Sequence, residues 1–492
     1  MKKGAVDVET RRRSVGFFLL VSVAFAFGLA AETVVPDAPA TERAPAAPDP
    51  VRVKARIDRD RLWFDRHLAS AYELGGHRDP KWDADALAAL SALAAAWSGD
   101  PQRSGNEQER AWQAAEKAVR SGCGDPLVRA VRARMYSLTV NESTAEAVRM
   151  HRDAVRAMAA SDYAPVLVAT AHLRAAEVMI ADAMAGGSAD ARDVVRQLEA
   201  AKALLPAVAA DFKVPSKVVI GLVEGILEAG RQLGADRQQE AAPILELFAK
   251  ARDWQDALVP LLRASFLVAY AWDARGNESG AETTSTRHRV FAARMEEADK
   301  ELAQAVALDP LSPSIAPLML AVELGQGRGR PRMESWFAYG VAVDPGTVDV
   351  YMAKLHYLEP SWYGSAAAML DFGRQCVAAG EWALKQPLVL GGAHFELAYQ
   401  LADDMADYFA GNGEACADVR HAYEPFLERF PDAAYERSAY ALMLYHCGDY
   451  TGADRHFRTL GGDGRVGPFD SRAHYESVRI DAAARALKEK HR

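Results

Sequence analysis

Apolar residues along this chain recur three or four positions apart, which is the period of an α-helix. Residues 84–97 and 169–184 show this spacing clearly, whereas no stretch alternates apolar and polar residues as a half-buried strand would. Gly and Pro residues, among them Pro206 and Pro215, separate one apolar stretch from the next. The pattern predicts an all-α protein. In the first half of the chain, the predicted helices cover residues 59–74, 84–97, 107–120, 126–138, 143–160, 163–185, 189–205, 216–233, 236–251 and 255–275.

The second half of the chain repeats itself. Residues 298–310 and 333–345 carry corresponding apolar and small residues, 35 positions apart, and both end in Asp-Pro. Residues 419–426 and 453–460 form a second echo with a period of 34 positions. This period, with a small, a bulky and a small residue before a closing proline, is typical of tetratricopeptide (TPR) repeats. We therefore predict a TPR-like solenoid of helix-turn-helix repeats that is irregular in its N-terminal half.

The N-terminus has the layout of an export signal. Five basic residues precede an apolar run over residues 15–30, which ends in the small residues that a signal peptidase requires. We expect residues 1–30 to be a signal peptide cleaved after Ala30, and the protein to be periplasmic or secreted. An uncleaved segment that anchors the protein in the membrane is the alternative, because the run is barely long enough to cross a bilayer.

The rest of the chain divides into four predicted regions. Residues 31–55 are rich in Pro and Ala and are expected to be a disordered tether, with structure beginning near Arg56. Residues 56–255 should form an irregular all-helical region, and residues 256–467 the TPR-like repeats, with about nine extra residues looping out near 408–413. Residues 468–492 should hold a polar C-terminal capping helix.

Charge argues against a nucleic-acid partner. The chain has 492 residues, and without residues 1–30 it would hold 53 basic and 65 acidic residues, a net charge of −12. Nucleic-acid binding requires a basic surface, and the only dense basic segment is the loop at residues 327–332. We interpret that loop as solvated, and expect a protein or peptide partner, with membrane contact only through an uncleaved N-terminal segment.

Three segments resemble a known family. These are residues 272–276, residues 307–310 and above all residues 354–365, whose sequence is Lys-Leu-His-Tyr-Leu-Glu-Pro-Ser-Trp-Tyr-Gly-Ser. They are similar to an uncharacterised bacterial TPR-like family with a Pro-x-Trp-Gly-Gly-Ser segment, and the similarity covers about residues 255–400. Tyr363 stands where that family often has Gly. The family has no assigned activity, so the resemblance implies a helical repeat fold and no catalytic residue or cofactor.

No motif for catalysis or metal binding is present. The twelve histidines lack the spacing of metal ligands, and residues 462–467 match Gly-x-Gly-x-x-Gly without the preceding strand that phosphate binding requires. We interpret that segment as a turn. The sequence therefore predicts no catalytic, metal-binding or cofactor-binding residues.

One segment concentrates aromatic rings with polar tips, which is what recognition surfaces use. Its members are Tyr351, His356, Tyr357, Trp362 and Tyr363. We take them as candidate partner-binding residues. The alternative is that these rings pack between irregular helices and fix the turn.

Four cysteines follow the export signal: Cys123, Cys376, Cys416 and Cys447. In the repeat register, Cys416 begins one unit's second helix and Cys447 ends the next unit's first helix. Because those helices pack antiparallel, the two cysteines are candidates for a disulfide in an oxidising compartment. Alternatively, both are small buried apolar residues that never meet. Cys123 and Cys376 should stay free.

Two functions remain open. A non-enzymatic exported scaffold that binds a protein or peptide partner on the first helices of successive pairs is the main hypothesis. An enzyme of unrecognised type, such as a hydrolase, with its site at the loops near Arg275 and Trp362, is the alternative.

Overall fold

The computed structural model of the protein describes residues 44–99, 105–140, 144–253, 256–276, 285–401, 405–462, 464–469 and 471–491. Within these residues 78% are helical and no strand is present. The prediction of an all-α fold is therefore confirmed. The signal peptide and most of the tether lie outside the described residues.

The helices of the first half follow the predicted order. They are α2 (Pro50–His67), α3 (Ala69–Gly75), α4 (Asp83–Ser98), α5 (Glu107–Arg120), α6 (Pro126–Met135), the π-helical turn η1 (Tyr136–Val140), α7 (Thr144–Ala159), α8 (Pro165–Met184), α9 (Ala191–Ala210), α10 (Ser216–Gln232), α11 (Arg237–Ala251) and α12 (Leu258–Arg275).

The second half continues with helices whose phase matches the repeat. They are α13 (Ser285–Leu308), α14 (Ile315–Gln326), α15 (Arg330–Val343), α16 (Asp349–Tyr357), α17 (Ala366–Ala379), the 3-10 turns η2 (Trp382–Leu384) and η3 (Gln386–Leu388), α18 (Val389–Leu401), α19 (Met405–Phe409), α20 (Gly413–Arg429), α21 (Ala434–His446), α22 (Tyr450–Leu460) and α23 (Arg472–Lys490). The short helix α19 occupies part of the predicted insertion. The side chain of Ser471 caps α23 by accepting a hydrogen bond from the backbone N–H of His474.

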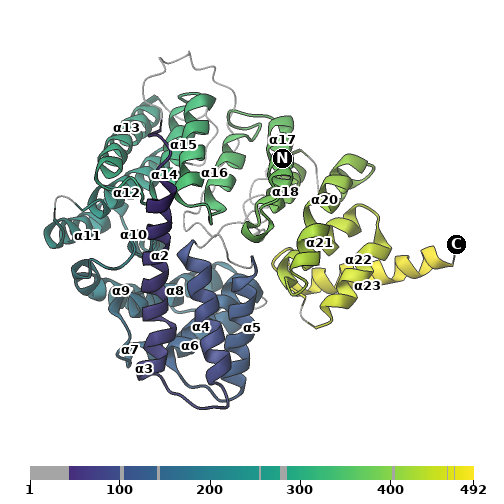
Figure 1. Cartoon of the computed structure of the whole chain (residues 1–492), viewed down its shortest axis with the longest axis horizontal. Coiled ribbons are helices and arrows are strands. Elements are labelled where there is room, and N and C mark those ends of the chain that lie inside the picture. Colours follow the sequence, from purple (N-terminus) through teal and green to yellow (C-terminus); the bar gives the residue numbers. More distant parts are fainter. Residues whose placement is uncertain are drawn as a thin grey trace.

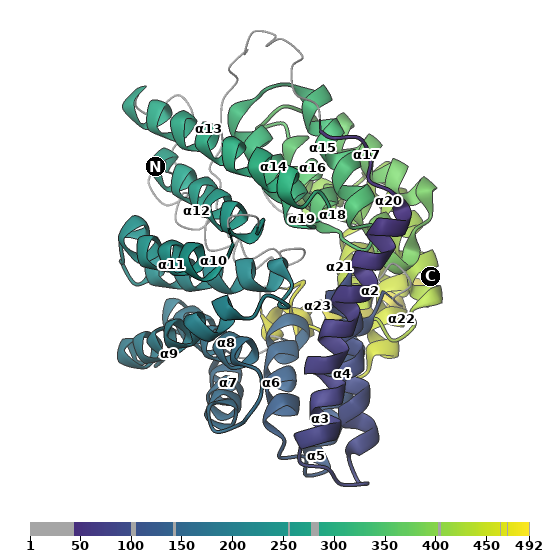
Figure 2. The same ribbon diagram turned by 60° about the vertical axis from the view of Figure 1, so that its left-hand side comes forward.

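Antiparallel helix pairs stack into a curved solenoid (Figure 1). From α8 to α18 each even-numbered helix packs against the preceding helix in the sequence and also against the next even-numbered helix. From α12 to α18 the even-numbered helices are the first helices of the pairs, and they form a continuous inner layer. Figure 2 shows the stack rising from α4 through α12 and turning over at α13 to α18.

Helix α2 starts earlier than predicted and crosses between distant parts of the solenoid. It begins at Pro50, where the side chain of Asp49 accepts a hydrogen bond from Val51 and caps the helix. The tether prediction for residues 31–55 is therefore wrong for its last six residues. Val53 and Ile57 of α2 are buried, and this burial stabilises a helix that composition alone did not indicate.

A buried arginine fixes α2 to the second half of the chain. The guanidinium of Arg56 donates to the backbone oxygen of Val343, 2.7 Å away at the end of α15, and to the carboxylate of Asp60 at 3.2 Å. Asp344 lies 3.6 Å from the same guanidinium. In Figure 2, α2 runs from the side of α4 towards α15, so it bridges the first repeats and the later ones.

Pro206 does not end a helix, contrary to the prediction. Helix α9 continues through Pro206 to Ala210, although a proline inside a helix removes one backbone hydrogen bond. Val208 and Ala209, which follow the proline, are buried. Their burial offsets the cost of the missing hydrogen bond, so packing decides where this helix ends.

The C-terminal repeats return to the first ones. One apolar core cluster runs from Trp63 to Leu397, across the predicted division at residue 255, and a second runs from Leu388 to Ala482. Arg465, in the predicted glycine-rich turn, donates to the carboxylate of Glu109 on α5, and both side chains are buried. The C-terminal repeats therefore lie against the first ones, and residues from both border one central cavity.

Candidate functional site

The predicted aromatic segment is largely used for packing within the protein. Tyr351 and Tyr357 are 8% and 2% exposed, whereas Tyr363 is 38% exposed. The ring of Tyr351 stacks on Phe372 at 6.2 Å, and the hydroxyl of Tyr363 donates to the backbone oxygen of Leu324. Burial raises the pKa of Tyr351 to about 12 and thereby keeps its hydroxyl neutral.

Trp362 and His356 are also held by internal contacts. The guanidinium of Arg275 lies 5.4 Å from the ring centre of Trp272 and 5.2 Å from that of Trp362. Nδ1 of His356 lies 2.5 Å from the Glu359 carboxylate. These contacts join the end of α12 to the turn at 358–365. The loops that the sequence suggested as an alternative enzyme site are therefore occupied by packing contacts between Arg275 and the two tryptophans. Contact of the exposed edge of Tyr363 with a partner stays a prediction.

The two candidate disulfide cysteines lie together. Cys416 on α20 and Cys447 after α21 are paired, with their Cα atoms 5.8 Å apart, within the range of protein disulfides. The register derived from the repeats thus places the two helix ends as expected. Cys123 and Cys376 are unpaired and buried.

A central cavity of about 1170 Å³ lies elsewhere in the fold. Helices α4, α6, α8, α10, α12 and α14 line it, together with turns near residues 344–349 and 466–469. None of the five predicted aromatic residues contributes to this lining. The first helices of the pairs do face a common cavity, as the repeat predicts. Most of the charged residues in its lining, however, belong to the irregular N-terminal half.

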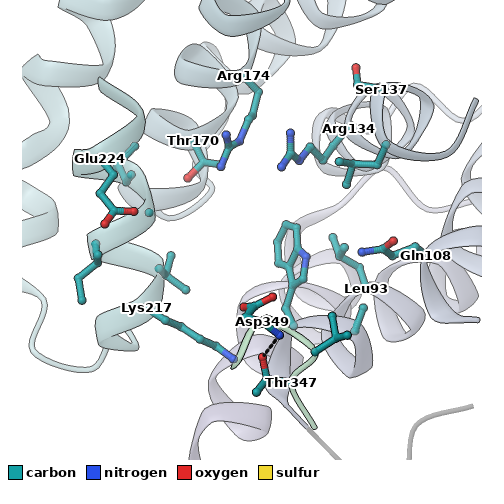
Figure 3. Close-up of a pocket in the computed structure, with 18 of the residues that line it drawn as sticks. Leu93, Gln108, Arg134, Ser137, Thr170, Arg174, Lys217, Glu224, Thr347 and Asp349 are labelled. Carbon is teal, nitrogen blue, oxygen red and sulfur yellow. Dashed lines mark hydrogen bonds between the residues drawn. The ribbon is translucent and has the colours of Figure 1, made fainter. Parts of the chain in front are cut away.

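Two arginines face each other in the cavity (Figure 3). Arg134 extends from α6 and Arg174 from α8. Burial, and to a smaller extent the charge of Arg174, lowers the pKa of Arg134 to about 9. Next to them His151 is buried, with Nε2 lying 3.0 Å from the hydroxyl of Ser137. Burial and the two arginines lower the pKa of His151 to about 3, so this imidazole is neutral at physiological pH.

A second polar group lies on α10. Figure 3 shows Lys217 extending towards Thr347 and Asp349, and Glu224 on the same helix farther along the cavity wall. Burial lowers the pKa of Lys217, and Asp344, Asp60 and Asp349 oppose that shift. Burial also raises the pKa of Glu224 to about 7, although the Ser265 hydroxyl donates to it.

Other charges in the lining are neutralised by direct ion pairs. Arg237 contacts Glu228 at 2.8 Å and Asp273 at 2.5 Å, and Lys385 contacts Glu436 at 2.5 Å. Overall, eight acidic and six basic side chains line the cavity. The lining therefore has no excess of positive charge, and its unusual feature is the local pair formed by Arg134 and Arg174.

Sequence patterns alone did not identify these residues. Thr170 and Arg174 on α8, and Lys217 and Glu224 on α10, are four or seven positions apart, so each pair shares one helix face. Polar residues at that spacing are ordinarily a solvated face. Only the curvature of the solenoid turns the faces of α6, α8 and α10 towards one another.

The described part of the chain contains no group of three or more His, Cys, Asp or Glu side chains that could hold a metal ion. Within the same residues, no helix combines the length and the apolar character needed to cross a membrane. No family model and no curated protein sequence matches the chain.

Among solved structures, the chain is similar to the human IFIT1 dimer with m7Gppp-AAAA. The alignment covers 83% of this chain and 78% of that chain, with 12% sequence identity and a TM-score of 0.35. At that score, the similarity carries no conclusion about the ligand of this protein.

Proposed function

We propose that this protein is a non-enzymatic, exported scaffold that binds an extended peptide segment of a protein partner in its central cavity. The cavity of about 1170 Å³ on the inner face of the helical repeats is the observation that carries the proposal. Small-molecule pockets usually measure about 300 to 1000 Å³. The space suits a longer ligand, such as a short length of polypeptide.

The lining supports a peptide ligand. Aromatic rings such as Trp97 and Phe266 offer apolar contact, and Gln108 and Thr347 add hydrogen-bonding groups that peptide amides need. A nucleic acid would require an excess of basic groups along its path, whereas acidic residues outnumber basic ones here. This distribution favours a peptide over a polyanion.

Export rests on the N-terminal pattern and is supported by the cysteines. Residues 1–30 carry the features of a cleaved signal, and the pairing of Cys416 with Cys447 fits an oxidising compartment such as the periplasm or the extracellular medium. Mass spectrometry of the mature N-terminus tests this part, with Ala31 expected as the first residue. Recovery of the protein with an intact N-terminus in the membrane fraction would show instead that it is anchored.

Filling the cavity tests the binding site. Ala171→Trp places a large ring in the lining of the cavity, whereas Ala181→Trp places the same ring on the exposed face of the same helix. Partner proteins that co-purify with the exported wild type should be retained by Ala181→Trp and fall at least about tenfold with Ala171→Trp. Equal recovery with both variants, at equal thermal stability, would place the partner outside the cavity.

A further inference from the structure

Among the cavity cations, Arg134 and Lys217 have no hydrogen bond or ion pair to any residue that the structure describes. The carboxylates of Asp344, Asp60 and Asp349 oppose the effect of burial on Lys217, whereas Arg134 faces a second arginine. Arg174 is only partly satisfied, because its Nη1 contacts both Glu177 carboxylate oxygens at 2.6 Å while its Nε is buried without a hydrogen-bond partner. Two guanidinium groups thus point into one cavity, and each has N–H groups without an acceptor in the described part of the protein (Figure 3).

The charge balance of this site is positive by one unit. Glu177 neutralises Arg174, and His151 remains uncharged at neutral pH because its pKa is lowered to about 3. Arg134 remains uncompensated. A buried charge without a counter-ion is costly, so a singly charged oxyanion placed between the two guanidinium groups would remove that cost.

Polar and apolar groups both surround the two arginines. His151 and Ser137 provide polar atoms, and Val131 on α6, Met158 on α7 and Leu167 on α8 also line the cavity. A ligand group next to the anion would therefore meet aliphatic side chains. A doubly charged phosphate monoester would leave one unit of negative charge in that environment, whereas a carboxylate would leave none.

We propose that Arg134 and Arg174 bind the C-terminal carboxylate of the peptide, and that the residue carrying this carboxylate has an apolar side chain. This inference rests on the proposed function, since it names the end of the peptide that enters the cavity. The flat guanidinium fork suits a carboxylate, because its parallel N–H groups can donate to both oxygens. Arg134 and Arg174 are binding residues here and carry out no chemistry.

Two peptide pools test the proposal. Randomised hexapeptides with an acetylated N-terminus are prepared either with a free C-terminal carboxylate or with a C-terminal amide, and binding to the immobilised full-length protein is measured. The wild type should enrich free acids with apolar last residues about tenfold over the amides, a difference of about 1.4 kcal/mol. Arg134→Met and Arg174→Met should abolish this preference.

A matched variant and a small ligand complete the experiment. Arg129→Met removes an exposed arginine from the same helix α6 and should leave the preference unchanged. Octanoate serves as a free apolar carboxylic acid, and octanamide as its uncharged counterpart. Octanoate should raise the melting temperature of the wild type and of Arg129→Met, and should leave that of Arg134→Met unchanged.

Each result separates the inference from the proposed function. Equal binding of free acids and amides would overturn the carboxylate site and leave the peptide scaffold standing. If octanoate binds in an Arg134-dependent way and neither peptide pool binds, the peptide scaffold is wrong and the carboxylate site is one for a free acid. If a short single-stranded RNA binds in an Arg134-dependent way and none of the peptides or octanoate does, both the peptide scaffold and the carboxylate site are wrong, and the ligand is a nucleic acid. If none of the probes binds, both claims are refuted.

Discussion

At the scale of single residues, Arg134 lowers the stability of the free protein and provides a group for binding. Its partly buried guanidinium faces Arg174 without a counter-ion, and this environment lowers its pKa to about 9. Arg134→Met keeps the aliphatic stem and removes the charge, so we expect the free energy of unfolding to rise by about 1 to 2 kcal/mol. Chemical denaturation measures this change. A loss of stability would show that the charge is compensated in the free protein.

Glu224 predicts a pH dependence with a definite sign. Its pKa is raised from 4.5 to about 7 by burial, against the opposing effects of Ser265 and Arg237. The folded state therefore holds a proton that the unfolded state releases, and the folded state loses stability as pH rises from about 4.5 to 7. Above that range the loss is complete and amounts to on the order of 3 kcal/mol.

Glu224→Gln isolates this contribution from those of the other titrating groups. The variant should match the wild type near pH 4.5 and become progressively more stable than the wild type up to about pH 8. Denaturation midpoints of both proteins across that range measure the difference. A constant difference at all pH values would mean that Glu224 titrates normally.

At the scale of helices, the Cys416–Cys447 pair connects two neighbouring units. The bond would close a loop with a sequence separation of 31 residues, and the chain-entropy model gives such a loop about 3.7 kcal/mol of stabilisation. The double variant Cys416→Ala/Cys447→Ala should lose roughly that amount relative to the oxidised wild type. Non-reducing peptide mapping of the exported protein provides the control, and free thiols at both positions would contradict the pairing.

The repeat fixed the phase of the helices well but not their ends. The small residue Ala441 is fully buried in α21, and the Asp-Pro pair at 309–310 directly follows α13. Helix α9 passes through Pro206, and α2 begins at Pro50 inside a Pro- and Ala-rich segment. These ends depend on burial against distant helices, which local composition does not contain.

At the scale of the whole molecule, the packing of the C-terminal repeats against the first ones depends on contacts that no repeat period encodes. Arg465 and Glu109 are 356 positions apart, and their side chains are 6% and 4% exposed. Elsewhere, a Cβ atom on Gly346 would collide with the backbone oxygen of Gly99, so this approach between distant turns requires glycine. A period of 34 or 35 residues predicts contacts between successive units only.

The Arg465–Glu109 contact should be important for stability. Arg465→Met leaves the Glu109 carboxylate buried without its cation, so we expect a loss of about 3 to 5 kcal/mol. The matched variant Arg156→Met breaks an exposed pair with Asp153 and should cost less than about 1 kcal/mol. Equal losses in the two variants, measured by chemical denaturation, would mean that the Arg465–Glu109 contact contributes nothing to folding.

The candidate site could not be predicted from sequence for the same reason as the packing of the C-terminal repeats against the first ones. The aromatic segment around Trp362 attracts notice because its five rings lie within 13 residues of sequence, yet most of these rings pack inside the protein. Arg134 and Arg174 come from separate helices and meet only because the solenoid curves. Local spacing identifies clusters within a segment, whereas this cavity is assembled from many segments.

Photo-crosslinking in the exporting cell tests the central claim most directly. The photoreactive residue p-benzoylphenylalanine replaces Gln108, which lies in the cavity, or Tyr363, which is the exposed member of the aromatic segment. Leu74, on the exposed surface of α3, serves as the control. We expect position 108 to crosslink to the C-terminal end of a peptide from one protein partner. We expect no crosslink at positions 363 and 74. Crosslinks at position 363 with none at position 108 would contradict the claim.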